Sequence, residues 1–290
     1  MTNVLATKAV LANLNISLWT ARKYDRKVTD KVNKDYHAEE DAGRYNKLLI
    51  AKDAIAELTN TAANARLYHH KVTQPWSESG GPRLLATANY MKHTELRKEK
   101  QKYESLADKF AIAYPAMIED AKKRLNSMFN ADDYPDPSIV REKFRFDLNY
   151  LPCPDASDFR VSLSSEIMEE MKSDLESQMK SAVEIGLKDV RDRIIQTVGH
   201  MAEKLKAYQP EKGIHGNPFR DSLVENVREL VDLLPAFNLT NDKNLTKIIH
   251  RMETQLCEVD AKELRENEAE RKNVAKQAAS ILAEVEKFMA

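Results

Sequence analysis

The stretch SSEIMEEMKSDLESQMKSAVEIGLKDVRDRIIQTVGHMAEKLKAY, Ser164 to Tyr208, carries the longest helical pattern in the chain. Its apolar residues recur about every 3.6 positions rather than every 3.5, which favours a straight helix packed on neighbours over a left-handed coiled coil. At about 1.5 Å per residue such a helix spans roughly 65 Å. The apolar positions are Met168, Met171, Leu175, Met179, Val183, Leu187, Val190, Ile194, Val198, Met201, Leu205 and Tyr208.

Further helical patterns lie on both sides of this stretch. The segment QPEKGIHGNPF interrupts the pattern, and Asn217 followed by Pro218 is typical of a helix start. Pro115 lies inside another helical pattern, where it is expected to kink or break the helix. The other expected helices span about 35–70, 89–129, 219–234, 241–257 and 260 to the C-terminal end.

Three short segments alternate apolar and polar residues with the period of a half-buried strand. They are LNISLW near the start, KFRFDLNYL and DFRVSLS, and the last two are separated by the turn-like PCPDAS. We predict a β-hairpin over 143–163, with strands at about 143–151 and 158–163. A strand at about 13–20 is expected to complete a small antiparallel sheet, because an isolated hairpin is marginal in water.

The predicted fold class is therefore mainly α: an elongated bundle of long helices, coiled-coil-like in appearance, with a small antiparallel sheet. Apolar residues make up 42% of the chain and charged residues 31%, with only 7 glycines, which is typical of long charged helices. No repeat or flexible linker separates domains. We expect one elongated helical protein over 1–290, with the hairpin at 143–163 inserted between its helical halves.

The net charge limits which partners the whole protein can attract, and the cysteine content indicates the cellular compartment. The net charge of −1 gives no global attraction to nucleic acid or to an anionic membrane. Cys153 and Cys257 have no metal-ligand or CxxC spacing, which fits two free thiols in a reducing compartment. The N-terminal segment has no long apolar run, so we expect neither a signal peptide nor a membrane span, and a cytoplasmic location.

No catalytic signature is present. His69 and His70 are adjacent and would point about 100° apart on a helix, so they cannot chelate one ion from one face. His37, followed by Glu39, Glu40 and Asp41, could bind a metal, but acidic helix starts are commonplace and the structural interpretation is preferred. Phosphate-binding loops and nucleophile elbows are missing from the sequence. We therefore expect a non-enzymatic protein without metal or cofactor.

A basic N-terminal segment suggests an alternative function in nucleic-acid binding. Arg22, Lys23, Arg26 and Lys27 lead a run of cations, and RKEKQK with KKR at 122–124 adds a second concentration. If these residues converge with Trp19 or Tyr24 on one surface, they would form a groove for single strands. Glutamates are interleaved with the second cluster, so ordinary solvated helix faces are the competing interpretation.

Acidic residues dominate the beginning of the long helix. Glu166, Glu169, Glu170, Asp174 and Glu176 stand against Lys172, and the 258–270 segment is also acidic. Opposed basic and acidic regions in one molecule suggest head-to-tail self-association or docking to a charged partner. Intramolecular pairing explains the same pattern.

The stretch TQPWSESGGPRLLATANYMKHTELRKEK, beginning at Thr73, interrupts the helices and contains one of the two tryptophans. A proline, a Gly-Gly pair and a tryptophan are enough to build a tight, ordered connection, and an arginine can cap carbonyls or meet a carboxylate. The stretch is interpreted either as a structural corner or as an exposed docking loop. The candidate docking residues are Pro75, Trp76, Gly80, Gly81, Arg83 and Tyr90.

Four blocks in this order carry a resemblance: ARLYHHKVTQPWSESGGPRLLATANYM, FAIAYPAMIEDAKKRLNSMFNADDYPDP, FRFDLNYLPCPDASDF and FRDSLVENVRELVDLLPAFNLTNDKNL. Together they resemble an uncharacterised domain family of bacterial phages, plasmids and integrative elements. Members are often encoded beside a MoxR-like AAA+ ATPase and a von Willebrand factor A-type protein. The resemblance implies a partner role in an ATPase-driven machine, and the family carries no established catalytic residue. Pro82 departs from the glycine-arginine step expected after the tryptophan and stiffens the turn.

These observations lead to two expected functions. The first is an adaptor or scaffold of a phage or mobile-element system, oligomeric and partnering the ATPase in the host cytoplasm. The alternative is a nucleic-acid-binding accessory protein in phage or plasmid replication or recombination.

Overall fold

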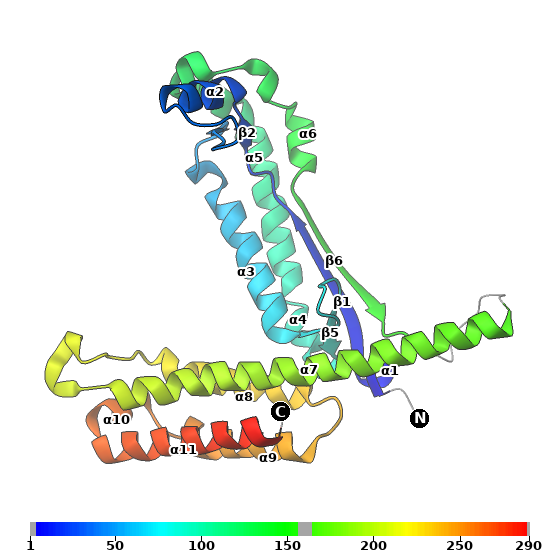
Figure 1. Cartoon of the computed structure of the whole chain (residues 1–290), viewed down its shortest axis with the longest axis vertical. Coiled ribbons are helices and arrows are strands. Elements are labelled where there is room, and N and C mark those ends of the chain that lie inside the picture. The colour runs from blue at the N-terminus through cyan, green and yellow to red at the C-terminus, as the bar shows by residue number, and fades with distance from the viewer. Residues whose placement is uncertain (1–3, 156–163, 289–290) are drawn as a thin grey trace. The chain divides into compact units, whose positions relative to one another are not determined.

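The computed structural model of the chain is mainly helical with a small antiparallel sheet, as the sequence predicts (Figure 1). It describes residues 4–155 and 164–288. Within these, contacts group the chain into two units. The α7 unit comprises Met1–Asn13, Lys71–His93 and Tyr150–Ala290, and the α5 unit comprises Leu14–His70 and Thr94–Asn149.

The α7 unit is built on the predicted long helix, α7, which runs from Ser165 to Ala207. From Val190 onward its apolar stripe is buried, and α7 packs against α8 (Ser222–Phe237) and α11 (Glu268–Phe288). The remaining helical elements of the unit are α1 (Val4–Lys8), α4 (Tyr90–His93), α9 (Lys243–Met252) and α10 (Ala261–Glu266), with short turns at Thr87–Asn89, Pro210–His215 and Glu253–Cys257. The predicted helix start at Asn217 is wrong, because this residue has a φ of +54° and α8 begins five residues later.

The α5 unit packs α5 (Leu96–Leu125) beside α3 (Ala56–Val72) around an aromatic core (Figure 1). Tyr103, Phe110 and Tyr114 from α5 meet Phe144 and Phe146 there. Pro115 neither ends nor interrupts α5, which continues for ten residues beyond it. The other elements of the unit are β2 (Arg22–Tyr24), α2 (Arg26–Asp35), β3 (Asn46–Leu48) and α6 (Pro137–Glu142), with short turns at Asp53–Ile55, Asn126–Met128 and Ala131–Asp133.

The predicted helix over 35–70 is wrong in its first half. The helix α2 ends at Asp35, and α3 begins only at Ala56. Between them, β3 pairs in antiparallel register with β2, and Leu49 and Ile50 enter the core with 2% exposure each. The apolar residues whose spacing suggested a continuous helix are therefore buried through strand pairing and core contacts instead.

The sheet has four strands in the order β4-β5-β1-β6. The predicted strand at 13–20 lies earlier in the chain, as β1 (Ala9–Ser17), and the predicted strand at 143–151 is β6 (Arg145–Pro152). The expected partner strand at 158–163 lies outside the described residues. The strands β4 (Gln74–Pro75) and β5 (Arg83–Ala86) were not predicted, because Leu84 and Leu85 are both buried and leave no alternation in a four-residue strand.

Candidate docking surfaces

The interrupting stretch folds into a β-hairpin between α3 and α4. Strands β4 and β5 pair Gln74 with Leu84 and Pro75 with Arg83. The turn needs glycine because Gly80 and Gly81 have φ values of +88° and +94°, which other residues rarely adopt. The Ser77 hydroxyl donates to the Gly80 carbonyl at 2.7 Å. The connection is therefore tight and ordered, as expected, and it is a hairpin.

Two guanidinium groups fix this hairpin at the carbonyl of Thr73. Arg83 donates to the Thr73 hydroxyl at 2.8 Å and to its carbonyl at 3.2 Å. Arg193, on α7, donates to the same carbonyl at 2.8 Å and to the Lys71 carbonyl at 2.8 Å, and pairs with the Asp189 carboxylate at 2.8 Å. The expectation that Arg83 caps carbonyls is thus confirmed. Burial raises the pKa of Asp189, although the two arginines act in the opposite direction.

A second contact brings the hairpin close to the α7 backbone. The Gln74 amide donates to the Gly186 carbonyl at 3.1 Å. A Cβ atom on Gly186 would lie 3.3 Å from that amide nitrogen, so the absence of a side chain permits the approach. The hairpin is consequently held on α7 at two separate points.

The hairpin tip and α7 enclose an open groove of about 730 Å³, called here the Trp76 groove. Trp76 is half-buried and packs against a cluster that includes Leu84 and Ala182. The groove is lined by Trp76, Ser77, Glu78, Ser79, Gly80 and Pro82 from the hairpin and by Gln178, Ser181, Glu184, Ile185 and Lys188 from α7. Trp76 therefore anchors the hairpin, as expected of a structural corner, and its exposed part lines the groove.

Tyr90, the last candidate docking residue, does not line the Trp76 groove. It begins α4, and its ring centroid lies 5.2 Å from that of Tyr150. The Tyr150 hydroxyl is 2.9 Å from Nδ1 of the fully buried His93. Burial lowers the pKa of His93 to about 4, so the imidazole is neutral near pH 7. Tyr90 thus belongs to a neutral aromatic cluster of the α7 unit.

The four basic candidates lie on the α5 unit, in β2 and α2. Arg22, Lys23, Arg26 and Lys27 are all exposed. Tyr24, between them, is 45% exposed. The guanidinium carbon of Arg44 lies 5.9 Å from the centre of the Tyr24 ring. The structure thus places an exposed aromatic ring among exposed cations, as the nucleic-acid-binding hypothesis requires.

Of the other parts of the predicted basic groove, only the KKR segment at 122–124 lies near β2: Arg124 donates to the carbonyl of Leu48, which pairs with Arg22. The Trp19 ring packs edge-on against Phe110 and Tyr114, with centroids 6.3 and 5.7 Å apart, so it belongs to the core. The second basic concentration falls at the two ends of α5. Arg97 and Arg124 are separated by about 40 Å of helix at 1.5 Å per residue.

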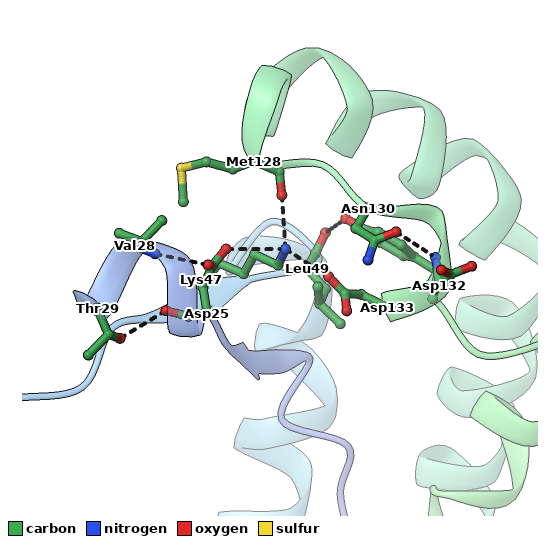
Figure 2. A network of polar contacts seen from close by, with 10 residues as sticks. Asp25, Val28, Thr29, Lys47, Leu49, Met128, Asn130, Asp132 and Asp133 are labelled. Carbon is green, nitrogen blue, oxygen red and sulfur yellow. Dashed lines mark hydrogen bonds and ion pairs between the residues drawn. The ribbon is translucent and has the colours of Figure 1, made fainter. Parts of the chain in front are cut away.

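A buried lysine fixes the start of α2 (Figure 2). Lys47 is only 6% exposed, and its ammonium lies 2.7 Å from the Asp133 carboxylate and 3.4 Å from that of Asp25. It also donates to the Met128 carbonyl at 2.9 Å. Asp25 caps α2 by accepting from the Val28 amide at 3.2 Å. Burial acts to lower the pKa of Lys47, but the hydrogen bonds and charges of the two carboxylates outweigh it and raise that pKa.

Among residues 4–155 and 164–288, no three His, Cys, Asp or Glu side chains are placed to hold a metal ion. Burial raises the pKa of both Cys153 and Cys257 to about 11, so each thiol stays protonated at neutral pH.

Within residues 4–155 and 164–288, no helix is long and apolar enough to cross a bilayer.

The candidate docking residues on the hairpin could be identified from the sequence, but the residues that surround them could not. Arg193, Asp189 and Gly186 face the hairpin from more than one hundred positions away along the chain. Nothing in the sequence distinguishes Lys47 from an exposed lysine.

Comparison of the chain with protein-family models, with curated proteins and with solved structures found no match.

Proposed function

We propose that the protein is a non-enzymatic adaptor or scaffold that docks a partner protein in the Trp76 groove. The observation that carries the proposal is a half-buried tryptophan lining an open groove whose wall is fixed to α7 by Arg83, Arg193 and Gln74. A rigid aromatic side chain in a preorganised site is the usual centre of binding energy in protein interfaces.

The lining of the groove suits an extended segment of a partner. Trp76, Pro82 and Ile185 offer apolar surface, while serine hydroxyls, Gln178 and both charge signs offer polar contacts. On the strength of the family resemblance, the partner is a MoxR-like AAA+ ATPase, with a von Willebrand factor A-type protein as a further component. The setting is the cytoplasm of a bacterium that carries the mobile element.

Trp76→Ala is expected to weaken binding to the MoxR-like ATPase by about 2 kcal/mol, or roughly thirtyfold, because it removes the aromatic anchor. Ser181→Arg is expected to weaken it as well, because it fills the groove from α7 without touching the anchoring bonds. The measurement is light scattering and calorimetry of the mixed proteins, with and without ATP. Met91→Ala is the control, since Met91 is 75% exposed and does not line the groove. Failure to form a complex in any nucleotide state would remove the ATPase from the proposal.

A second function, binding of single-stranded nucleic acid, is favoured by one observation. Tyr24 is exposed between basic residues, and Tyr36 and Tyr45, nearby in sequence, are 80% and 42% exposed. Exposed rings among cations are the elements of a stacking surface for single strands.

Reversing Arg22, Lys23, Arg26 and Lys27 to glutamate is expected to abolish binding of a single-stranded DNA oligonucleotide in fluorescence anisotropy at about 50 mM salt. Tyr24→Ala should weaken the binding without changing its salt dependence, because a stacking contact releases no counterions. The matched control reverses four exposed lysines of the α7 unit, Lys206, Lys243, Lys247 and Lys262. Equal losses in both reversed proteins, or no binding by the native chain, would exclude this function.

A further inference from the structure

The first part of α7, Ser165–Ser177, contains no buried residue, although its apolar stripe continues into the buried part of the helix. Met179 and Val183 are partly buried against the cluster that includes Leu84 and Ala182, and from Val190 to Leu205 the stripe is buried. Ile167 is 47% and Met171 38% exposed, and Met168 and Leu175 continue the same stripe half-buried. Figure 1 shows these turns running on beyond α8 and α11. We call Ser165–Ser177 the α7 overhang.

Charge limits what can cover the α7 overhang. It carries the five carboxylates of Glu166, Glu169, Glu170, Asp174 and Glu176 against one lysine, Lys172. Asp174 and Glu176 flank Leu175 on either side of the stripe. Pairing two overhangs through their stripes would bring like charges together at the rim, which is unfavourable. The complementary surface must therefore be apolar with a basic rim.

The α5 unit presents a surface of this kind, the α2 surface. Val28 is half-buried, and Val32 and Tyr36 are 42% and 80% exposed, at i, i+4 and i+8. The flanking exposed cations are Arg22, Lys23, Arg26, Lys27, Lys31 and Lys34, against the exposed Asp30 and Asp35. The row Val28 to Tyr36 and the row Met168 to Leu175 each extend about two helical turns, or roughly 11 Å.

We propose that the α7 overhang of one copy of this chain docks on the α2 surface of a second copy. The apolar rows pack together, and the carboxylates around Leu175 face Lys27 and Lys31. Because the two surfaces differ, the contact is heterologous and can repeat from copy to copy in a head-to-tail chain. A contact of two helical turns is small, so the association is weak and strongly dependent on salt.

The test is sedimentation velocity of the full chain over a concentration series at about 50 and 500 mM salt. The native chain is expected to exceed its monomer mass of 33.1 kDa as concentration rises at low salt, and to return to that mass at high salt. Asp174→Lys with Glu176→Lys makes an acidic-side variant, and Lys27→Glu with Lys31→Glu makes a basic-side variant. Each is expected to weaken self-association at least about tenfold.

Mixing the two variants provides the decisive measurement. The altered overhang of the first is now basic and the altered α2 surface of the second is acidic, so the mixture is expected to associate although neither variant does so alone. Glu203→Lys with Glu286→Lys is the control with the same charge change at exposed positions, and should associate like the native chain. All these positions are exposed, and circular dichroism checks that each variant is folded.

Three results would overturn the proposal: a monomeric native chain at low salt, loss of association in the control as well, or no association in the mixture. The proposal does not depend on the Trp76 groove, so Trp76→Ala should leave self-association unchanged. The acidic-side variant distinguishes self-association from nucleic-acid binding. This variant keeps the α2 surface intact, so it should lose self-association but still bind any DNA that the native chain binds.

Discussion

Replacing Lys47 by methionine is expected to lower the free energy of unfolding of the α5 unit by about 3–5 kcal/mol. The ammonium lies between Asp25 and Asp133, whose side chains are only 12% and 10% exposed. Without it, two nearly buried carboxylates face each other and the Met128 carbonyl loses its donor. Removing one member of a buried ionic group costs more than the group itself contributes, because uncompensated charge is left behind.

The measurement can be confined to the α5 unit because each unit contains one of the two tryptophans. Trp19 reports on the α5 unit once Trp76 is replaced by phenylalanine, and urea unfolding followed by Trp19 emission gives the free energy. Lys52→Met, at an exposed lysine, is the control and should change it by less than about 0.5 kcal/mol. Adding Asp133→Asn to Lys47→Met should recover part of the loss, because it removes one of the two facing charges. An equal loss in both lysine variants would contradict the role of the buried ion group.

The same pair of proteins gives a pH prediction with a definite sign. The pKa of Lys47 is raised above its ordinary 10.5 in the folded chain. The folded state therefore holds this proton more tightly than the unfolded state, and the stabilisation is fully present below the unfolded pKa. It is lost as pH rises through the raised pKa. The difference between native and Lys47→Met proteins is expected to be constant from pH 7 to 9 and to shrink above about pH 10.5.

The parts of the fold that followed from the sequence are those with long periodic signals. The 43 residues of α7 and the 30 of α5 repeat their apolar positions often enough to identify a helix. The alternation in β6 was also sufficient. In contrast, β3 has three residues, and its place is decided by pairing with β2 and by burial of Lys47. These contacts are non-local, so the local spacing of Leu48 and Leu49 was equally compatible with a helix.

The candidate surfaces divide in the same way. Pro75, Trp76 and the two glycines were recognisable because their backbone and packing properties are local. The wall of the Trp76 groove on α7 was not predictable, because it lies about one hundred residues away and consists of ordinary helix-surface residues. The basic side chains of α2 were recognised from charge alone, whereas the burial of Trp19 and the exposure of Tyr24 depend on the core of the α5 unit.

From the sequence pattern alone, every apolar position along α7 is equally expected to be buried. A matched pair of substitutions distinguishes the buried positions from the exposed ones. Ile194 is fully buried, and Ile194→Asp places an unpaired carboxylate where the stripe meets other helices. The expected loss is at least about 4 kcal/mol in the free energy of unfolding of the α7 unit. Met171→Asp makes the same chemical change on the same stripe, but in the overhang, and should cost less than about 0.5 kcal/mol.

Trp76 emission in the Trp19→Phe background measures both variants, because Trp76 belongs to the α7 unit. If Ile194→Asp does not fold, its absence from the soluble fraction beside a normally expressed Met171→Asp gives the same answer. A large loss for Met171→Asp in the dilute monomer would mean that the chain covers its own stripe, and the overhang would then have no free surface for a second copy. A small loss in the monomer together with weakened association at low salt would separate the two uses of one helix: its last two thirds hold the α7 unit together, and its first turns are free to bind.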